Sequence, residues 1–250
     1  MLLEGRTAVI SGAASARGIG RATAELFASH GARIAILDLD GHASQSVAQE
    51  LPGSGHIGIQ CDVSEEGSCQ AAAQQAIEHF GRINILINNA GITQPLKTME
   101  IRLANWAKVI DVNLTGVLLL SQAFIPHMVE QGGGSVACMS SVSAQRGGGI
   151  FGGPHYSAAK AGVLGLAKAM AREFGPAGIR FNCVTPGLIQ TDITGGKLTD
   201  EMRADIIKGI PLARLGDAID VARIYLFLAS DLSSYVTGAT IDVNGGMLIH

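Results

Sequence analysis

The stretch Thr7-Ala8-Val9-Ile10-Ser11-Gly12-Ala13-Ala14-Ser15-Ala16-Arg17-Gly18-Ile19-Gly20 decides the fold. It joins a short apolar run to a glycine cluster, and a segment with helical spacing follows at residues 20–29. Glycines at such a junction let the backbone turn tightly and approach a pyrophosphate, whose charge the N-terminus of the next helix stabilises. The stretch therefore predicts the strand, loop and helix of a dinucleotide site.

Short apolar runs alternate with helical segments along the rest of the chain. Strands that alternate with helices, and are apolar almost throughout, belong to a parallel sheet covered on both faces. We predict an α/β fold with one doubly wound domain of about seven strands. The expected strands are residues 7–10, 33–37, 56–59, 83–87, 135–138, 179–184 and 240–243, and the expected helices are roughly residues 20–29, 42–50, 65–80, 104–131, 156–174 and 219–229.

Two segments interrupt this alternation. One is the glycine-rich loop at residues 147–154, and the other is a long connection at residues 187–210. Long loops beyond the carboxyl ends of parallel strands are where such folds bind ligands. Both loops are expected to border one cleft.

Charge and cysteine content exclude several classes of function. The net charge of −3 leaves no electrostatic footprint for nucleic acid or an anionic membrane. The four cysteines show no Cys-x-x-Cys spacing and no clustering with histidine, so neither a metal site nor a disulfide framework is expected, and a reducing cytoplasm is the simplest location.

The start of the chain lacks the apolar core of a signal peptide, and apolar runs such as residues 117–120 are too short to span a bilayer. Few residues are charged and many are apolar, which suggests surface buried between subunits.

Asp38 ends the second predicted strand, eighteen residues past Gly20. Its carboxylate can accept hydrogen bonds from the adenosine ribose and would repel a 2′-phosphate, which favours NAD over NADP. Arg17 argues the other way, because a cation in the loop could receive that phosphate. A helix cap or turn is the plain alternative for Asp38, although Asp40 is better placed for that role.

Asp62 and Val63 follow the third predicted strand, where they could flank the adenine. The alternative is an ordinary strand end that caps the next helix at Ser64.

Tyr156-Ser157-Ala158-Ala159-Lys160 opens a helical segment, so Tyr156 and Lys160 share one helix face. A phenol has a reference pKa of about 10, and a nearby ammonium lowers it. Tyr156 could therefore move a proton near neutral pH. Taken alone, the two residues are better explained as an exposed pair.

Further polar residues follow the central strands: Asn88-Asn89-Ala90-Gly91 ends the fourth, Ser140-Ser141 ends the fifth, and Asn113 lies within a predicted helix. Each could be a turn former or a helix residue of low propensity. Together, in this order between the glycine loop and Tyr156, they make coincidence improbable.

With Pro186-Gly187 and Asp242-Val243-Asn244-Gly245-Gly246, these motifs resemble the short-chain dehydrogenase/reductase family along the whole chain, because seven motifs agree in order and approximate spacing. The resemblance implies a single Rossmann-type domain over residues 1–250, with a substrate loop around residues 187–210. It also implies hydride transfer between a nicotinamide and a secondary alcohol or ketone.

The same resemblance implies a catalytic tetrad of Asn113, Ser141, Tyr156 and Lys160. Tyr156 as phenolate would accept the hydroxyl proton as hydride leaves the carbon. Lys160 would lower the pKa of Tyr156 and bond the nicotinamide ribose, and Ser141 would donate to the developing alkoxide or carbonyl oxygen. Asn113 is expected to hold a water that links Lys160 to solvent.

Cofactor contacts are expected along the same cleft, and Ile189 and Thr191 match family positions that meet the nicotinamide carboxamide. The expected cofactor-binding residues are Gly12, Ser15, Arg17, Gly18, Ile19, Asp38, Asp62, Val63, Asn89, Ala90, Gly91, Tyr156, Lys160, Pro186, Gly187, Ile189 and Thr191.

Two intervals depart from the family pattern. Gly12 and Gly18 enclose five residues where three are usual, which leaves open whether Ser15, Ala16 or Arg17 faces the phosphates. The interval from Ser141 to Tyr156 is two residues longer than is common, so either Ser141 reaches the site or Ser143 replaces it.

The substrate is expected between Tyr156 and the nicotinamide, among residues that can hydrogen-bond hydroxyls or pair with a carboxylate. The candidates are Gln94, Ser143, Gln145, Arg146, His155 and Lys197, of which His155 could instead be an ordinary loop histidine. This polar lining and Asp38 favour an NAD-linked small hydroxy compound, such as a sugar, polyol or hydroxy acid.

The alternative enzyme is a 3-oxoacyl-acyl-carrier-protein reductase that uses NADPH. It would need a basic surface for its acidic partner, for which Arg146 and Arg172 are available. A non-catalytic module that senses nicotinamide redox state is the remote alternative, because such a module would not need the tetrad that this sequence contains. The resemblance implies a homotetramer with the last helix and strand at one interface, and the apolar tail at residues 247–249 is consistent with burial there.

Overall fold

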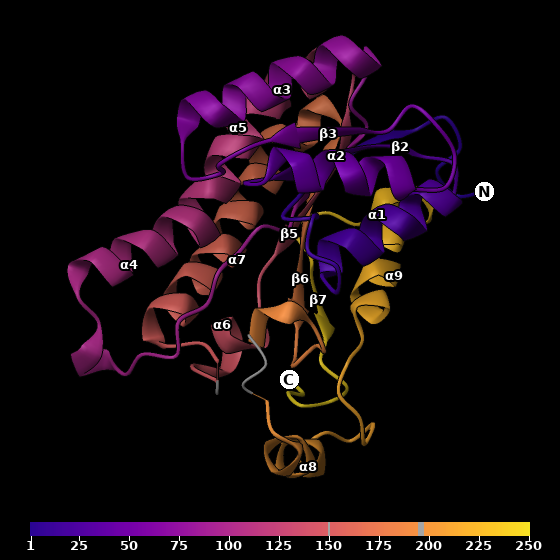
Figure 1. Cartoon of the computed structure of the whole chain (residues 1–250). Helices are drawn as coiled ribbons and strands as arrows, with labels where there is room; N and C mark the ends of the chain where they lie inside the picture. Colours follow the sequence, from indigo (N-terminus) through magenta and orange to yellow (C-terminus); the bar gives the residue numbers. More distant parts are fainter. Residues whose placement is uncertain (150, 195–197) are drawn as a thin grey trace.

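The computed structural model describes residues 1–149, 151–194 and 198–250. Over these residues seven parallel strands form one sheet in the order β3-β2-β1-β4-β5-β6-β7 (Figure 1). The predicted doubly wound α/β domain is therefore confirmed. The strands are β1 Thr7–Ser11, β2 Arg33–Asp38, β3 Ile57–Gln60, β4 Ile85–Asn88, β5 Gly134–Met139, β6 Ile179–Pro186 and β7 Thr240–Val243.

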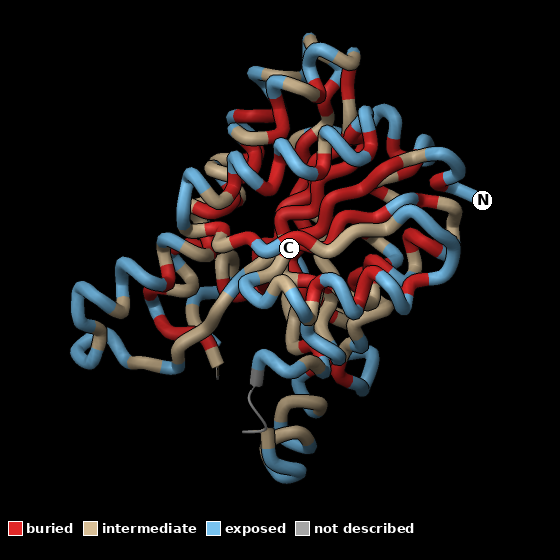
Figure 2. Tube along the Cα trace, turned by 45° about the horizontal axis from the view of Figure 1, so that its top comes forward, coloured by how far each residue is buried: buried red, intermediate tan, exposed pale blue. Residues whose placement is uncertain are grey.

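The central strands are buried on both faces, as their nearly continuous apolar sequences predict. Every residue of β1 and β4 is buried, and in Figure 2 the strands form the buried centre of the molecule. Parallel strands need this double covering because their crossover helices lie on both faces. The observed strand ends differ from the predicted ones by at most two residues, the usual uncertainty of element boundaries.

Helices cover the sheet in two layers (Figure 1). On one face, Phe27 and Tyr225 belong to an apolar cluster beneath α1 Ile19–Ser29, α2 Gly41–Glu50 and α9 Ala218–Ala229. On the other face, Phe80, Phe124 and Met170 belong to a cluster beneath α3 Glu66–Phe80, α5 Gly116–Glu130 and α7 Pro154–Phe174. The sheet is thereby enclosed, and its strand ends are left for a site.

The predicted helix at residues 104–131 is continuous but not uniform. It consists of α4 Leu103–Ile110, a π-helical turn at Asp111–Thr115, and α5. By length and composition alone this 28-residue helix could cross a membrane, and the core helix of a globular protein passes the same test. The burial of Val117, Leu120 and Phe124 against the sheet explains the apolar composition of α5.

The structure also contains short helices where we predicted none. Helix α6 Val142–Arg146 lies just before the glycine-rich loop, and α8 Asp200–Lys208 lies within the long connection, together with a 3₁₀ turn at Asp192–Thr194. Ser141 caps α6 by accepting from the Ser143 N–H, and Thr199 caps α8 by accepting from the Met202 N–H. Further 3₁₀ turns lie at Thr98–Glu100, Gly175–Ala177 and Asp231–Ser233.

The strand order reverses between β1 and β4, which are neighbours in the sheet. Loops that leave the carboxyl ends of these strands turn to opposite sides, and the crevice between them is where open α/β sheets bind ligands. The glycine loop after β1 and Asn88-Asn89-Ala90-Gly91 after β4 meet at this point.

Candidate active site

A cavity of about 1290 Å³ opens at the carboxyl ends of the strands. Its wall is formed by residues that follow β1 to β6, by α4 and α6, and by the start of α7. A cavity of this size suits an extended ligand together with a small second one. All the expected cofactor-binding residues except Arg17 line this cavity.

Glycine is required at two positions where the loop after β1 packs against its neighbours. Gly12 has a φ of +64°, and a Cβ there would lie 2.7 Å from the Ala90 Cα. A Cβ on Gly20 would lie 2.5 Å from the Gly12 carbonyl oxygen. The Asn89 side-chain amide donates to the Ser11 and Gly12 carbonyl oxygens, each at 2.9 Å, so the end of β4 holds the loop in place.

The first turn of α1 presents its backbone toward the cavity. Its N-cap, Gly18, has no side chain to accept from the first N–H groups, and Ser15, Gly18 and Ile19 line the cavity. Unsatisfied N–H groups and the helix dipole make such a terminus suitable for a phosphate. The donor set therefore fits the pyrophosphate of a dinucleotide.

Asp38 lies at the end of β2 in the cavity wall. Its carboxylate accepts from the Ala14 N–H at 2.9 Å and from the Leu39 N–H at 2.8 Å, which fixes the carboxylate beside the glycine loop. The helix-capping alternative belongs to Asp40 instead, because Asp40 accepts from the Ala43 N–H at the start of α2.

Asp62 and Val63 also line the cavity. The Asp62 carboxylate accepts from the Ser64 N–H at 3.0 Å and from the Ser64 hydroxyl at 2.6 Å. These contacts hold Asp62 at the cavity edge. The alternative of a helix cap at Ser64 is not formed, because the N-cap of α3 is Glu65.

Ser141, Tyr156 and Lys160 come together in the cavity wall. Tyr156 lies in the first turn of α7, and the buried Lys160 ammonium lies 5.8 Å from the centre of the Tyr156 ring. Lys160 donates to the Met139 carbonyl oxygen at 2.8 Å. The predicted pairing on one helix face is thus present, with Lys160 buried and Tyr156 half-buried in the cavity wall.

Burial governs the pKa values of both residues. It raises the pKa of Tyr156, while a hydrogen bond with Ser141 acts in the opposite direction. Burial also lowers the pKa of Lys160 to about 8. The expectation that the Lys160 ammonium lowers the pKa of the phenol is therefore corrected, because desolvation of the phenolate has the larger effect and Ser141 is the residue that opposes it.

Asn113 does not line the cavity but lies just behind it, in the π-helical turn. Its amide donates to the Ile92 and Val109 carbonyl oxygens, each at 2.9 Å, and its buried Oδ1 has no partner. A Cβ on Gly91 would lie 2.7 Å from this Oδ1 and 3.4 Å from the Lys160 Nζ. The unpaired acceptor and the ammonium therefore border the same small space.

The substrate candidates divide into three groups. Ser143 and Arg146 line the cavity. Gln94, His155 and Gln145 do not, which corrects their expected positions. Lys197 lies outside the described residues.

The three displaced residues form contacts elsewhere. The His155 Nε2 and Gln94 Oε1 atoms lie 3.2 Å apart, and burial lowers the pKa of His155, as suits a packed loop histidine. The Gln145 amide donates to the Asp242 carboxylate at 2.8 Å and lies 3.1 Å from the His250 Nε2 atom, because α6 directs Gln145 toward β7 and the chain end.

Arg17 also departs from expectation. Its guanidinium Nε atom lies 2.7 Å from the Asp192 carboxylate, whereas Ser15 lines the cavity. Of the residues left open in the glycine loop, Ser15 is thus the one whose side chain reaches the wall.

Several residues in the wall were missed. They include Lys108 on α4, Asp111 in the π-helical turn that follows it, and Met247 near the chain end. Nothing in their spacing marks them, since tertiary packing alone brings these segments to the mouth. Asp192 and Asp205 also line the cavity, and they lie in the connection at residues 187–210 that was expected to border it. Within the described ranges, no group of three or more His, Cys, Asp or Glu side chains could hold a metal ion.

The fold and this site define a Rossmann-type, dinucleotide-binding protein. The family model described as enoyl-(acyl carrier protein) reductase matches residues 12–248. An uncharacterized short-chain type dehydrogenase/reductase of Sinorhizobium fredii is 73% identical over the whole of both chains. A 3-oxoacyl-[acyl-carrier-protein] reductase of Thermotoga maritima is 40% identical, also over the whole of both chains.

Among solved structures, a short-chain dehydrogenase/reductase from Brucella melitensis, titled glucose/ribitol dehydrogenase, superposes with a TM-score of 0.91. It is 34% identical, and the match covers 100% of this chain and 99% of that one. The chain therefore belongs to the short-chain dehydrogenase/reductase family, whose members are nicotinamide-dependent oxidoreductases.

Proposed function

We propose that this protein transfers a hydride between NAD(H) and the secondary alcohol or ketone of a small polar hydroxy compound. The convergence of Ser141, Tyr156 and Lys160 in the wall of a cavity that also contains Asp38 is the observation that carries the proposal. The cofactor, when bound, supplies the hydride donor or acceptor, and the chain supplies the proton chemistry.

Tyr156 is the proton-transferring residue. In oxidation its phenolate accepts the hydroxyl proton, and in reduction its phenol returns that proton. Burial raises the pKa of the phenol, and the hydrogen bond with Ser141 favours the phenolate. Ser141 therefore has two roles, because its hydroxyl can also donate to the substrate oxygen as charge develops there.

Lys160 and Asn113 carry the proton onward. The space beside Gly91, bordered by the Asn113 Oδ1 and the Lys160 Nζ, suits a water that accepts from Lys160 and donates to Asn113. With a pKa of about 8, Lys160 can both hold and release a proton near neutral pH. When the cofactor is bound, the Lys160 ammonium would also donate to the nicotinamide ribose.

NAD is the proposed cofactor because of charge at the adenosine end. Asp38 would accept from the ribose hydroxyls and repel a 2′-phosphate. Arg17, which argued for NADP, already pairs with Asp192. We propose the other expected cofactor contacts because these residues line the cavity. They lie within residues 12–91 and at Pro186, Gly187, Ile189 and Thr191.

A small polar substrate is proposed for the end of the cavity near Tyr156. Ser143 and Arg146 offer a hydroxyl and a guanidinium there, and the connection at residues 187–210 contributes wall residues as the proposed substrate loop. The Brucella protein titled glucose/ribitol dehydrogenase supports a sugar or polyol.

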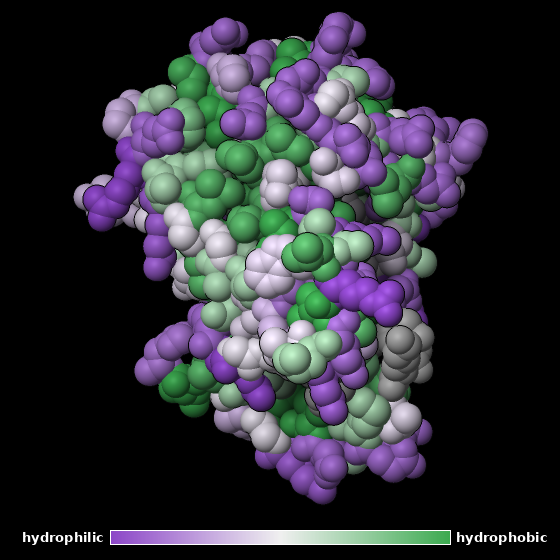
Figure 3. All heavy atoms as spheres, turned by 90° about the vertical axis from the view of Figure 1, so that its left-hand side faces the viewer, coloured by the Kyte–Doolittle hydropathy of each residue, from purple (hydrophilic) through white to green (hydrophobic). Residues whose placement is uncertain are grey.

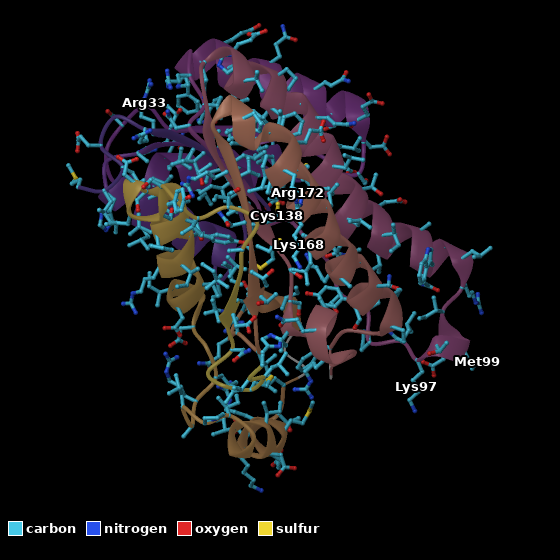
Figure 4. The ribbon with its side chains drawn as sticks, turned by 180° about the vertical axis from the view of Figure 1, so that it is seen from behind. Arg33, Lys97, Met99, Cys138, Lys168 and Arg172 are labelled. Carbon is cyan, nitrogen blue, oxygen red and sulfur yellow. The ribbon has the colours of Figure 1, made fainter. Side chains whose placement is uncertain are left out.

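The alternative is a 3-oxoacyl-acyl-carrier-protein reductase using NADPH. The Thermotoga relative favours it, as do Lys108 and Arg146 in the cavity wall. The net charge of −3 argues against a surface for an acidic partner. Arg172, which could serve such a surface, lies in the last turn of α7 (Figure 4), about 24 Å along the helix from Tyr156.

Steady-state rates test these alternatives directly. The enzyme is assayed with NAD and NADP against sugars, polyols, hydroxy acids and 3-oxoacyl thioesters. We expect turnover of a polar hydroxy compound with NAD. Turnover restricted to acyl thioesters with NADPH would establish the alternative, and a complete lack of turnover with tight NADH binding would favour the redox-sensing module.

We also propose that the protein acts as a cytoplasmic homotetramer. Members of this family are typically oligomeric, and helices α4 and α5 carry exposed apolar side chains. Figure 3 shows hydrophobic residues gathered on the side of the molecule that carries these helices. The exposed apolar residues of α4 and α5 are Leu103, Trp106, Leu118 and Val129.

A further inference from the structure

The glycine loop and the long connection after β6 are joined by one carboxylate. Asp192 accepts from the Ser15 hydroxyl at 2.9 Å, from the Arg17 backbone N–H at 3.1 Å, and from the Arg17 guanidinium Nε at 2.7 Å. Burial contributes little here, because the Arg17 and Asp192 side chains are 75% and 40% exposed. The contact therefore lies at the mouth of the cavity.

These contacts decide where the Arg17 charge is directed. Ser15 and Asp192 line the cavity and Arg17 does not, so the guanidinium is held at the rim. A guanidinium is the group that best receives a phosphate, because its N–H donors match two phosphate oxygens. Asp192 occupies one of those donors and neutralises the charge.

We propose that Asp192 is a specificity-determining residue that withholds Arg17 from the 2′-phosphate of NADP. The inference rests on the proposed use of NAD and deepens it. The chain then disfavours NADP in two places: Asp38 repels the additional phosphate, and Asp192 engages the cation that would otherwise bind it. The two effects act on one phosphate from separate loops.

The size of the Asp192 effect follows from its exposure. An exposed ion pair is weak, so its competition with a phosphate lowers affinity without abolishing it. We expect removal of Asp192 to tighten NADPH binding about three- to ten-fold relative to NADH, a change that corresponds to one exposed charge-assisted contact. Asp38 still provides the larger discrimination.

A double-mutant cycle tests the coupling by binding alone. Dissociation constants for NADH and NADPH are measured by nicotinamide fluorescence for the wild type, Asp192→Ala, Arg17→Ala and the double variant. We expect the NADPH gain in Asp192→Ala to disappear when Arg17 is also replaced, because the gain acts through the released guanidinium.

Asp205→Ala is the matched control. Asp205 also lines the cavity, but its carboxylate pairs with Lys208 at 2.7 Å. Its removal takes away the same charge without releasing Arg17. The proposal is overturned if Asp205→Ala gives the same shift, if Asp192→Ala tightens both cofactors equally or changes neither, or if the gain persists without Arg17. A wild-type preference for NADPH would refute the proposed cofactor, and the cycle would still decide the role of Asp192.

Discussion

At the residue scale, the environment of Tyr156 differs from what its neighbours in sequence suggest. The spacing to Lys160 correctly predicts a shared helix face, yet the raised pKa of the phenol follows from burial. Desolvation depends on what the rest of the chain places around the ring, and a local motif does not contain that information. Ser141, fifteen residues earlier, is the residue that favours the phenolate.

Replacement of the two serines separates their roles. Ser141→Ala removes the hydrogen bond to Tyr156 and the donor to the substrate oxygen, so we expect kcat to fall by about 10²- to 10³-fold. Ser143→Ala removes only a proposed substrate contact, so it should raise KM and leave kcat close to that of the wild type. A larger loss in Ser143→Ala than in Ser141→Ala would show that Ser143 performs the role.

Burial of Lys160 should appear in the stability of the protein. The pKa of Lys160 is about 8 in the folded chain against 10.5 for the free side chain. Between these values the unfolded state holds the proton and the folded state does not, so stability rises with pH, by at most about 1.4 kcal/mol per unit. Below pH 8 both states hold the proton and this contribution is constant.

Lys160→Met should therefore lose this rise between pH 8 and 10.5. The free energy of unfolding is measured by urea titration across the window for both proteins. Identical slopes for the wild type and Lys160→Met would contradict the assigned pKa.

At the element scale, long periodic helices and buried strands are predictable, and short capped helices are not. Helix α6 lies just before the glycine-rich loop and α8 lies within the long connection, where we predicted no helix. Tertiary contacts stabilise helices of this length more than their own propensity does. The π-helical turn around Asn113 is likewise invisible in the periodicity, although such turns are frequent at functional sites.

The glycine loop after β1 offers a test at this scale. Gly12→Ala would place a Cβ 2.7 Å from the Ala90 Cα in a residue with a φ of +64°, so we expect a loss of about 1 to 3 kcal/mol in stability and weaker NADH binding. Gly67→Ala is the control, since a Cβ there meets nothing within 4 Å at the start of α3. Equal stability of the two variants would show that the loop tolerates a side chain.

At the scale of the whole molecule, helix α4 and the 3₁₀ turn before it, Thr98–Glu100, project from the sheet with apolar side chains at their surface. Met99, in this turn, is 95% exposed, and Figure 4 places it near Lys97 at the outer end of the projection. Together with Leu103, Trp106, Leu118 and Val129 on α4 and α5, it forms exposed apolar surface of the kind that is typical of interaction sites, and the proposed homotetramer would bury it.

Leu118→Glu should therefore weaken subunit association, because it places a charge within the apolar face of α5. Sedimentation velocity is expected to show smaller species than for the wild type. Leu2→Glu alters a residue of similar exposure near the N-terminus and should not. An unchanged assembly in Leu118→Glu would place the interface elsewhere.

The sequence predicted the sheet, its helical layers and the cofactor side of the cavity in more detail than the substrate side. Glycine loops and strand ends have local physical requirements that a motif can report. Gln94, Gln145 and His155 were assigned as polar residues in segments expected to wall the substrate site, and their side chains turn to other partners. Lys108 and Met247 reach the same cavity from distant segments by packing alone.

Proton transfer by Tyr156 during hydride transfer is the central claim, and Tyr156→Phe tests it most directly. The value of kcat is measured with the substrate that the steady-state assays identify, and the NADH dissociation constant is measured separately. Tyr235→Phe is the control, because Tyr235 is an exposed tyrosine. We expect kcat to fall by about 10²- to 10⁴-fold in Tyr156→Phe with NADH binding preserved. Unchanged turnover in Tyr156→Phe would contradict the account.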